Sequence, residues 1–138
     1  MKIENEQEWA YCLSRGIEPM RDRHFEVAHD LRVELQEKLF GKGNHVENNK
    51  KFYRYAWKIA TPKVCEECGK PLESYDPTYI SHILSRGESP QTAYDLRNFN
   101  LLCAHHHEMW ESKITRKSMR IYERNQKIIS ILREEYGK

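Results

Sequence analysis

The chain has 138 residues, of which 38% are hydrophobic and 32% are charged, and its net charge is +2. This length fits one domain or a compact module with extensions, and the core that it can bury is modest. So small a net charge does not by itself indicate a nucleic-acid partner, and local clusters of charge carry more information.

No apolar run is long enough to cross a bilayer, and the first residues, MKIENEQEWAYC, lack the apolar centre of a signal peptide. We therefore expect no membrane partner and a cytoplasmic location, where thiols stay reduced. The four cysteines are then expected to be metal ligands or buried thiols rather than disulfides. A chain with a thin core often needs such a metal for stability.

Residues 1–62 are predicted to form an N-terminal helical extension. Helices are expected over residues 4–14, about 22–39 and about 50–60, because apolar side chains recur at helical spacing. The stretch 16–19 contains Gly16 and Pro19 and breaks the first two helices apart. The segment 41–49 has the composition of a loop, and Thr61-Pro62 ends the third helix.

Residues 63–113 have a different composition, with most of the cysteines and many of the seven histidines. We predict short strands over 79–83 and about 99–102, a loop over 84–97 and a helix over about 104–112. Residues 114–138 are predicted to carry a last helix over 116–136. Its apolar stripe is expected to pack against the domain or a partner chain, and consists of Met119, Tyr122, Ile129, Leu132 and Tyr136.

Two short ligand pairs indicate a structural zinc site. Cys65 and Cys68 form a C-x2-C pair, and Cys103 and His106 form a C-x2-H pair. Two thiolates or imidazoles separated by two residues can share one ion, and four such ligands close a tetrahedral shell around Zn2+. His105 is the competing fourth ligand, and reduced buried cysteines without metal are the alternative to the site as a whole.

The order of these pairs and the residues between them resembles the HNH endonuclease family. The resemblance covers about residues 64–112 and rests on Cys65-x2-Cys68, Ser81-His82-Ile83 and the run from Asn98 to His107. It implies a ββα-metal finger stapled by zinc. The expected fold class is therefore α+β, mainly helical with one small finger.

The resemblance also implies a role for each matching residue. His82 corresponds to the general base that takes a proton from the attacking water. Asn98 corresponds to the residue that holds the intervening loop through backbone hydrogen bonds, and His107 to a ligand of the catalytic metal. An imidazole is a suitable base near neutral pH, and a divalent ion can neutralise charge and assist the leaving oxygen. The expected catalytic ion is Mg2+, or another divalent ion such as Mn2+ or Ni2+.

The chain departs from the family pattern at two positions. Ser81 stands where many members carry a metal-binding Asp, and a serine hydroxyl is a poor ligand for Mg2+. His106 replaces a Cys, which zinc tolerates. Glu111 lies four residues after His107 on the predicted helix and so shares its face. We expect His107 and Glu111 to hold the catalytic ion together; a merely solvated Glu111 is the alternative.

Basic side chains mark the expected nucleic-acid contacts. A helix over 50–60 would place Lys50, Lys51, Arg54 and Lys58 on one broad stripe that could follow a phosphate backbone, or simply face solvent. Arg86 follows the proposed base and is expected to contact the scissile phosphate. Additional charge follows the predicted helix 104–112, at Lys113, Arg116 and Lys117.

We therefore expect a metal-dependent endonuclease that nicks or cuts DNA, in a phage, mobile-element, defence or recombination setting. A catalytically degenerate zinc finger that binds nucleic acid without cutting is the alternative, and Ser81 is the reason for it. An interaction protein that assembles through the last helix, with itself or with a phage or host protein, is a weaker third reading. A metalloprotease is disfavoured because the chain has no H-E-x-x-H motif.

Overall fold

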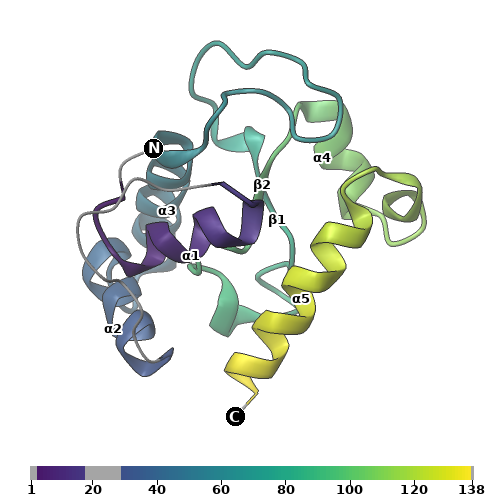
Figure 1. Cartoon of the computed structure of the whole chain (residues 1–138). Helices are drawn as coiled ribbons and strands as arrows, with labels where there is room; N and C mark the ends of the chain where they lie inside the picture. Colours follow the sequence, from purple (N-terminus) through teal and green to yellow (C-terminus); the bar gives the residue numbers. More distant parts are fainter. Residues whose placement is uncertain (1–2, 18–28, 138) are drawn as a thin grey trace.

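The computed structural model describes residues 3–17 and 29–137. Within them, five α-helices and a two-stranded sheet give an α+β fold, as predicted (Figure 1). None of these helices has the length and apolar character to cross a bilayer. The elements in chain order are α1 Glu6–Arg15, α2 His29–Phe40, α3 His45–Ile59, η1 Pro77–Tyr79, β1 Ile80–His82, η2 Pro90–Thr92, β2 Phe99–Leu101, α4 Ala104–Glu111, η3 Thr115–Ser118 and α5 Tyr122–Tyr136.

The sheet and α4 form a small β-β-α unit. β1 pairs with β2 in antiparallel register, with Ile80 opposite Leu101 and His82 opposite Phe99. α4 begins three residues after β2 ends. The loop between the strands contains the short 3-10 helix η2, and the sequence did not predict this helix. His82, at the end of β1, and His107, on α4, thus lie on the same side of this unit.

One hydrophobic core joins the N-terminal helices, the β-β-α unit and α5. Phe52 of α3, Phe99 of β2 and Leu132 of α5 are each fully buried and belong to the same cluster. Burying a side chain of this size stabilises a fold by about 1.5–3 kcal/mol. The apolar stripe on the last helix therefore packs against the domain itself.

The N-terminal helices differ from the predicted bounds in ways that capping explains. α1 begins after Asn5, whose side chain accepts a hydrogen bond from Glu8 N–H, and ends at Gly16, which adopts φ 68°. The predicted start of the third helix at residue 50 was wrong. α3 begins at His45 because the Asn44 side chain caps it by accepting from Glu47 N–H. The predicted start of the second helix near residue 22 lies outside the described residues.

The predicted start of the last helix at residue 116 was also wrong. A 3-10 turn occupies Thr115–Ser118, and α5 starts at Tyr122. The Glu67 carboxylate accepts hydrogen bonds from the backbone N–H groups of Arg120 and Ile121, at 2.8 and 3.0 Å. A carboxylate from elsewhere in the chain thus satisfies donors at the beginning of α5, where helices leave such groups unpaired.

Candidate functional site

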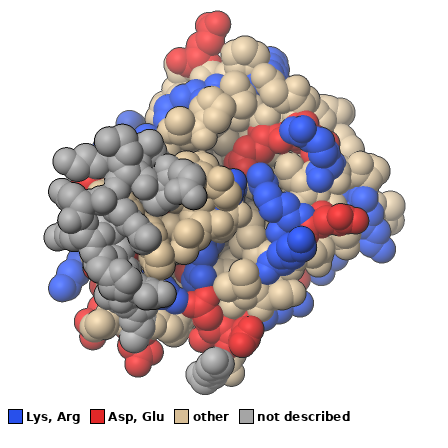
Figure 2. All heavy atoms as spheres, viewed as in Figure 1, with Lys and Arg blue, Asp and Glu red and all other residues tan. Residues whose placement is uncertain are grey.

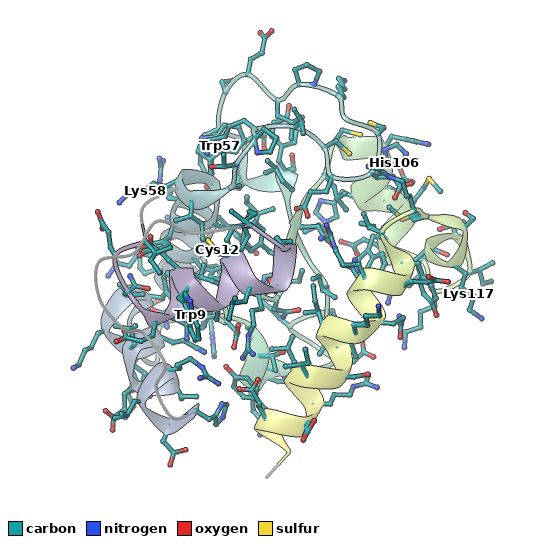
Figure 3. The ribbon with its side chains drawn as sticks, in the orientation of Figure 1. Trp9, Cys12, Trp57, Lys58, His106 and Lys117 are labelled. Atoms are coloured by element: carbon teal, nitrogen blue, oxygen red, sulfur yellow. The ribbon has the colours of Figure 1, made fainter. Side chains whose placement is uncertain are left out.

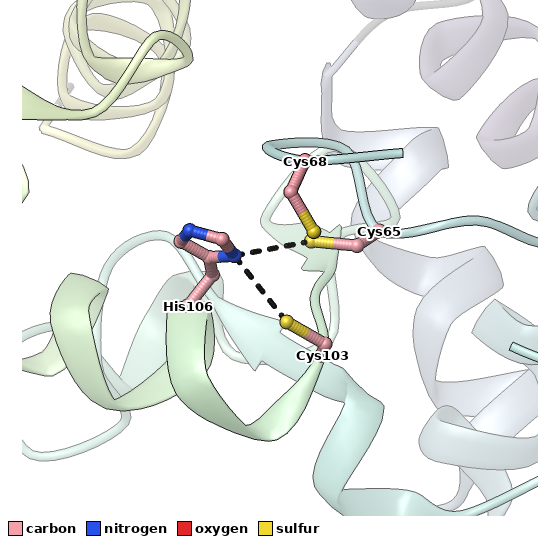
Figure 4. Close-up of side chains that lie close together, drawn as sticks. All are labelled: Cys65, Cys68, Cys103 and His106. Atoms are coloured by element: carbon pink, nitrogen blue, oxygen red, sulfur yellow. Dashed lines mark hydrogen bonds between the residues drawn. The ribbon is translucent and has the colours of Figure 1, made fainter. Parts of the chain in front are cut away.

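The two predicted ligand pairs meet at one point. The ligand atoms of Cys65, Cys68, Cys103 and His106 all lie within 4.8 Å of one another. His106 Nδ1 lies 3.7 Å from Cys65 Sγ and 3.3 Å from Cys103 Sγ (Figure 4). Ligand atoms on the corners of a tetrahedron around Zn2+ are separated by roughly 3.6–3.8 Å, given its usual bond lengths. The cluster therefore suits a tetrahedral ion such as zinc.

The local folds of the two pairs explain this convergence. Gly69, at φ 80°, turns the chain back so that its N–H donates to Cys65 O. Cys103 directly precedes α4, which places His106 one turn along that helix. Burial raises the pKa of the Cys65 thiol, and a hydrogen bond with the Lys70 backbone lowers the pKa of the exposed Cys68 thiol. Metal binding would favour the thiolate of both residues.

Two glutamates between Cys65 and Cys68 connect this cluster to the rest of the protein. Glu66 pairs with Arg15 of α1 at 3.3 Å and with Arg124 of α5 at 2.8 Å. It also accepts a hydrogen bond from the backbone N–H of Leu101 in β2. Glu67 binds the chain just before α5, as described above. Acidic side chains surrounded by basic ones are visible beside the upper part of α5 (Figure 2).

His82 is held as a neutral imidazole with one nitrogen fixed. Its Nε2 lies 2.8 Å from Ala93 O, and a carbonyl can only accept, so Nε2 carries the proton. Nδ1 is then left with its lone pair. The ring stacks on Phe52, with centroids 5.5 Å apart. Burial lowers the pKa of His82 to about 4; the bond to Ala93 opposes this change and the charge of Arg86 adds to it.

Asn98 fastens the loop that supplies Ala93. Its Oδ1 accepts from Leu84 N–H at 2.7 Å, and its Nδ2 donates to Leu84 O at 3.0 Å and Thr92 O at 3.1 Å. The side chain is fully buried. These are the backbone hydrogen bonds that the resemblance implies for this position. The Asn98 amide therefore ties Leu84, at the start of the loop, to Thr92 of η2.

His107 and Glu111 share one face of α4. His107 Nδ1 contacts Thr78 O, so in the neutral ring Nε2 presents its lone pair on the opposite side. That Nε2 lies 2.9 Å from Glu111 Oε1. Two ligands at right angles on an ion of Mg2+ size lie about 3.0 Å apart. Without an ion, the contact is that of an i,i+4 pair at hydrogen-bond distance; the same spacing and donor atoms suit a divalent cation bound between the two side chains.

A cleft of about 630 Å³ brings these groups together. His82 lines it from β1, His107 and Glu111 line it from α4, and Arg86 lines it from the loop between the strands. Ser81 is buried and is not among the lining residues. Trp110 stands at the back of the cleft, where its Nε1–H donates to Ile83 O at 3.1 Å.

The predicted basic stripe on α3 is exposed, although three of its side chains have neighbours of their own. Lys50 lies 3.5 Å from Glu47, Arg54 stacks over Tyr75 and Lys58 lies over Tyr55. Lys51 is exposed. Lys58 and His106 lie on opposite sides of the molecule in Figure 3. Contact between this stripe and nucleic acid stays a prediction.

Several groups of the site were missed from the sequence. The carbonyls of Thr78 and Ala93 orient the two histidines, and a backbone atom leaves no signal in the residue type. Tyr53 lines the cleft beside His82, and its place within an aromatic and basic run of α3 was the only signal for it. Comparisons of the chain with family models, curated proteins and solved structures give no match.

Proposed function

We propose that this protein is a metal-dependent HNH-type endonuclease that hydrolyses phosphodiester bonds of DNA. The observation that carries the proposal is the composition of the cleft. It is lined by His82 with a free Nδ1, by the His107–Glu111 pair and by Arg86. Hydrolysis of a phosphodiester requires a base for water, charge neutralisation and help for the leaving oxygen.

Each of these tasks has a candidate side chain. His82 Nδ1 accepts a proton from the attacking water, and the pKa of about 4 keeps the ring neutral at pH 7. Arg86 binds a nonbridging phosphate oxygen. His107 Nε2 and Glu111 Oε1 would hold a divalent ion, which supplies positive charge to the phosphate and the leaving oxygen. Asn98 keeps the loop, and with it Ala93 O, in the position that fixes His82.

The Cys65, Cys68, Cys103 and His106 cluster serves as scaffold in this proposal. Four protein ligands leave no open position for substrate, so a zinc ion there would be structural. The cluster joins the turn that carries Cys65 and Cys68 to the start of α4, the helix that carries His107. It would therefore help to hold His107 in place beside the sheet.

Ser81 supports a second candidate, a zinc finger that binds DNA without cutting it. Ser81 is only 1% exposed and does not line the cleft, so it offers no ligand in place of the usual Asp. If two protein ligands are too few to retain the ion, the basic groups around the cleft would bind phosphate without hydrolysis.

A plasmid-cleavage assay tests the two candidates against each other. We expect zinc-loaded wild type to nick or linearise supercoiled plasmid with Mg2+ or Mn2+. His82→Ala should lose at least about 100-fold in rate, the usual contribution of a general base. His45→Ala is the matched control, because His45 is exposed and lies outside the cleft. A plasmid shift on the gel without cleavage would favour the second candidate.

A further inference from the structure

One apolar side chain is exposed on the turn between α4 and α5. Ile114 is 85% exposed, more than any other large hydrophobic side chain in residues 3–17 and 29–137. The segment that carries it protrudes at the edge of the molecule (Figure 1). Single exposed isoleucines are common on protein surfaces, so exposure alone assigns Ile114 no function.

The turn around Ile114 is held in a defined shape. The Ser112 hydroxyl accepts from the backbone N–H groups of Ile114 and Thr115, both at 3.3 Å. The Thr115 hydroxyl donates to Met109 O at 2.6 Å. Arg116 donates from Nε to Trp110 O at 2.8 Å, and its guanidinium lies 4.4 Å from the Trp110 ring centroid. The side chain of Ile114 is thus held away from the core by a turn that is itself anchored.

The anchor of the turn also belongs to the cleft. Trp110 lines the cleft and donates to Ile83 O, the residue after His82. Lys113 and Arg116, on either side of Ile114, line the same cleft. Ile114 therefore stands at a fixed position next to the groups proposed to cut the phosphodiester bond.

The segment that carries Ile114 is basic, although Glu88 and Glu111 lie close to its cations. The segment 112–120 contains Lys113, Arg116, Lys117 and Arg120 and no acidic residue. Lys113 lies 3.4 Å from the exposed Glu88, a weak pair at the rim. Lys117 is exposed, and its side chain is directed away from the protein (Figure 3). Cations spaced on both sides of an apolar tip match the alternation of phosphates and stacked bases in duplex DNA.

We infer that Ile114 is a wedge that enters the minor groove of duplex DNA and unstacks a base step beside the cleft. The inference rests on the proposed function and names its substrate as double-stranded DNA bent at the cut. Apolar side chains such as isoleucine act in this way in proteins that kink the duplex, while flanking Lys and Arg bind the phosphates. Opening a base step would let one phosphate reach Arg86 and the His107–Glu111 pair.

The test measures base stacking directly, without cleavage. Duplexes with 2-aminopurine in place of several adenines are titrated with full-length, zinc-loaded His82→Ala protein, which leaves them intact. We expect fluorescence to rise at saturation, because the analogue brightens when it leaves the stack. Adding Ile114→Ser should abolish most of this rise and weaken binding about tenfold, as loss of one buried isoleucine would. Ile114→Leu should restore both.

Leu31→Ser is the matched control, since Leu31 is an exposed apolar residue on α2, at 54%. It should behave as the parent protein does. An equal fluorescence rise with Ile114→Ser would overturn the inference, as would a change of oligomeric state in that variant with unchanged DNA binding.

The same experiment separates this inference from the nuclease proposal. If plasmid stays uncut while the fluorescence rise depends on Ile114, the wedge stands and the nuclease proposal fails. If plasmid is cut equally by wild type and Ile114→Ser and fluorescence does not distinguish the variants, only the wedge fails. If no variant binds duplex, both fail.

Discussion

Removing the Asn98 side chain should cost more stability than its size suggests. Asn98→Ala deletes three hydrogen bonds to backbone groups and a longer one to the Thr92 hydroxyl, all in a fully buried position. Thr92 O keeps a second donor, the N–H of Asp95, whereas the N–H and C=O of Leu84 lose the partner that Asn98 gives them. Two orphaned buried backbone groups cost about 1–3 kcal/mol each, so we expect a loss of about 2–6 kcal/mol.

The loss can be measured by urea unfolding of the zinc-loaded protein, followed by tryptophan fluorescence, to which buried Trp110 contributes. Asn49→Ala is the control, because its half-buried side chain makes one hydrogen bond within residues 3–17 and 29–137, accepting from the Tyr94 hydroxyl. It should lose about 1 kcal/mol. A loss below about 1 kcal/mol for Asn98→Ala would refute the claim that this amide holds the loop.

Three further predictions concern the candidate zinc site, the proposed catalytic-metal pair and the proposed base. Cys65→Ser should lose the tightly bound zinc measured by elemental analysis and unfold the finger; retained zinc with normal melting would contradict the ligand set. Glu111→Ala should raise the Mg2+ concentration that half-saturates plasmid cleavage and leave zinc content unchanged. An Mg2+ titration identical to that of wild type would show that Glu111 is a solvated side chain and not a metal ligand. The pKa of His82 is lowered from 6.5 to about 4 on folding, so only the unfolded chain binds its proton between these values, and stability is lost as the pH is lowered through this range. Wild type should therefore lose about 2 kcal/mol more than His82→Phe between pH 7 and pH 5 in urea unfolding, and equal losses would show that His82 titrates normally.

The sequence predicted best where spacing alone determines geometry. Two residues between Cys65 and Cys68, and two between Cys103 and His106, predicted the cluster that the fold assembles. Glu111 follows His107 by four positions, which placed both on one face of a helix, and the structure has that helix at Ala104–Glu111. The geometry within each pair, and within the helix, does not depend on contacts with distant segments.

The parts that escaped prediction depend on contacts between distant segments. Glu67 determines where α5 begins, from a position 54 residues before Ile121. The pKa of His82 depends on burial against Phe52 and on the carbonyl of Ala93, and neither can be read from residues next to His82. The early start of α3 had a local signal in Asn44, but the glycines around it favoured a loop.

The position of Glu66 makes metal affinity a property of the whole chain. Its carboxylate can form ion pairs with Arg15 and Arg124 only when α1 and α5 are docked. Arg15 is itself 4% exposed, and a buried guanidinium left without its counter-ion is costly. By thermodynamic linkage, zinc binding that orders Cys65 and Cys68 would favour the docking of α1 and α5, and their docking would raise the affinity for zinc. A peptide trimmed to residues 63–113 would therefore chelate zinc more weakly than the complete protein, even though it retains every ligand.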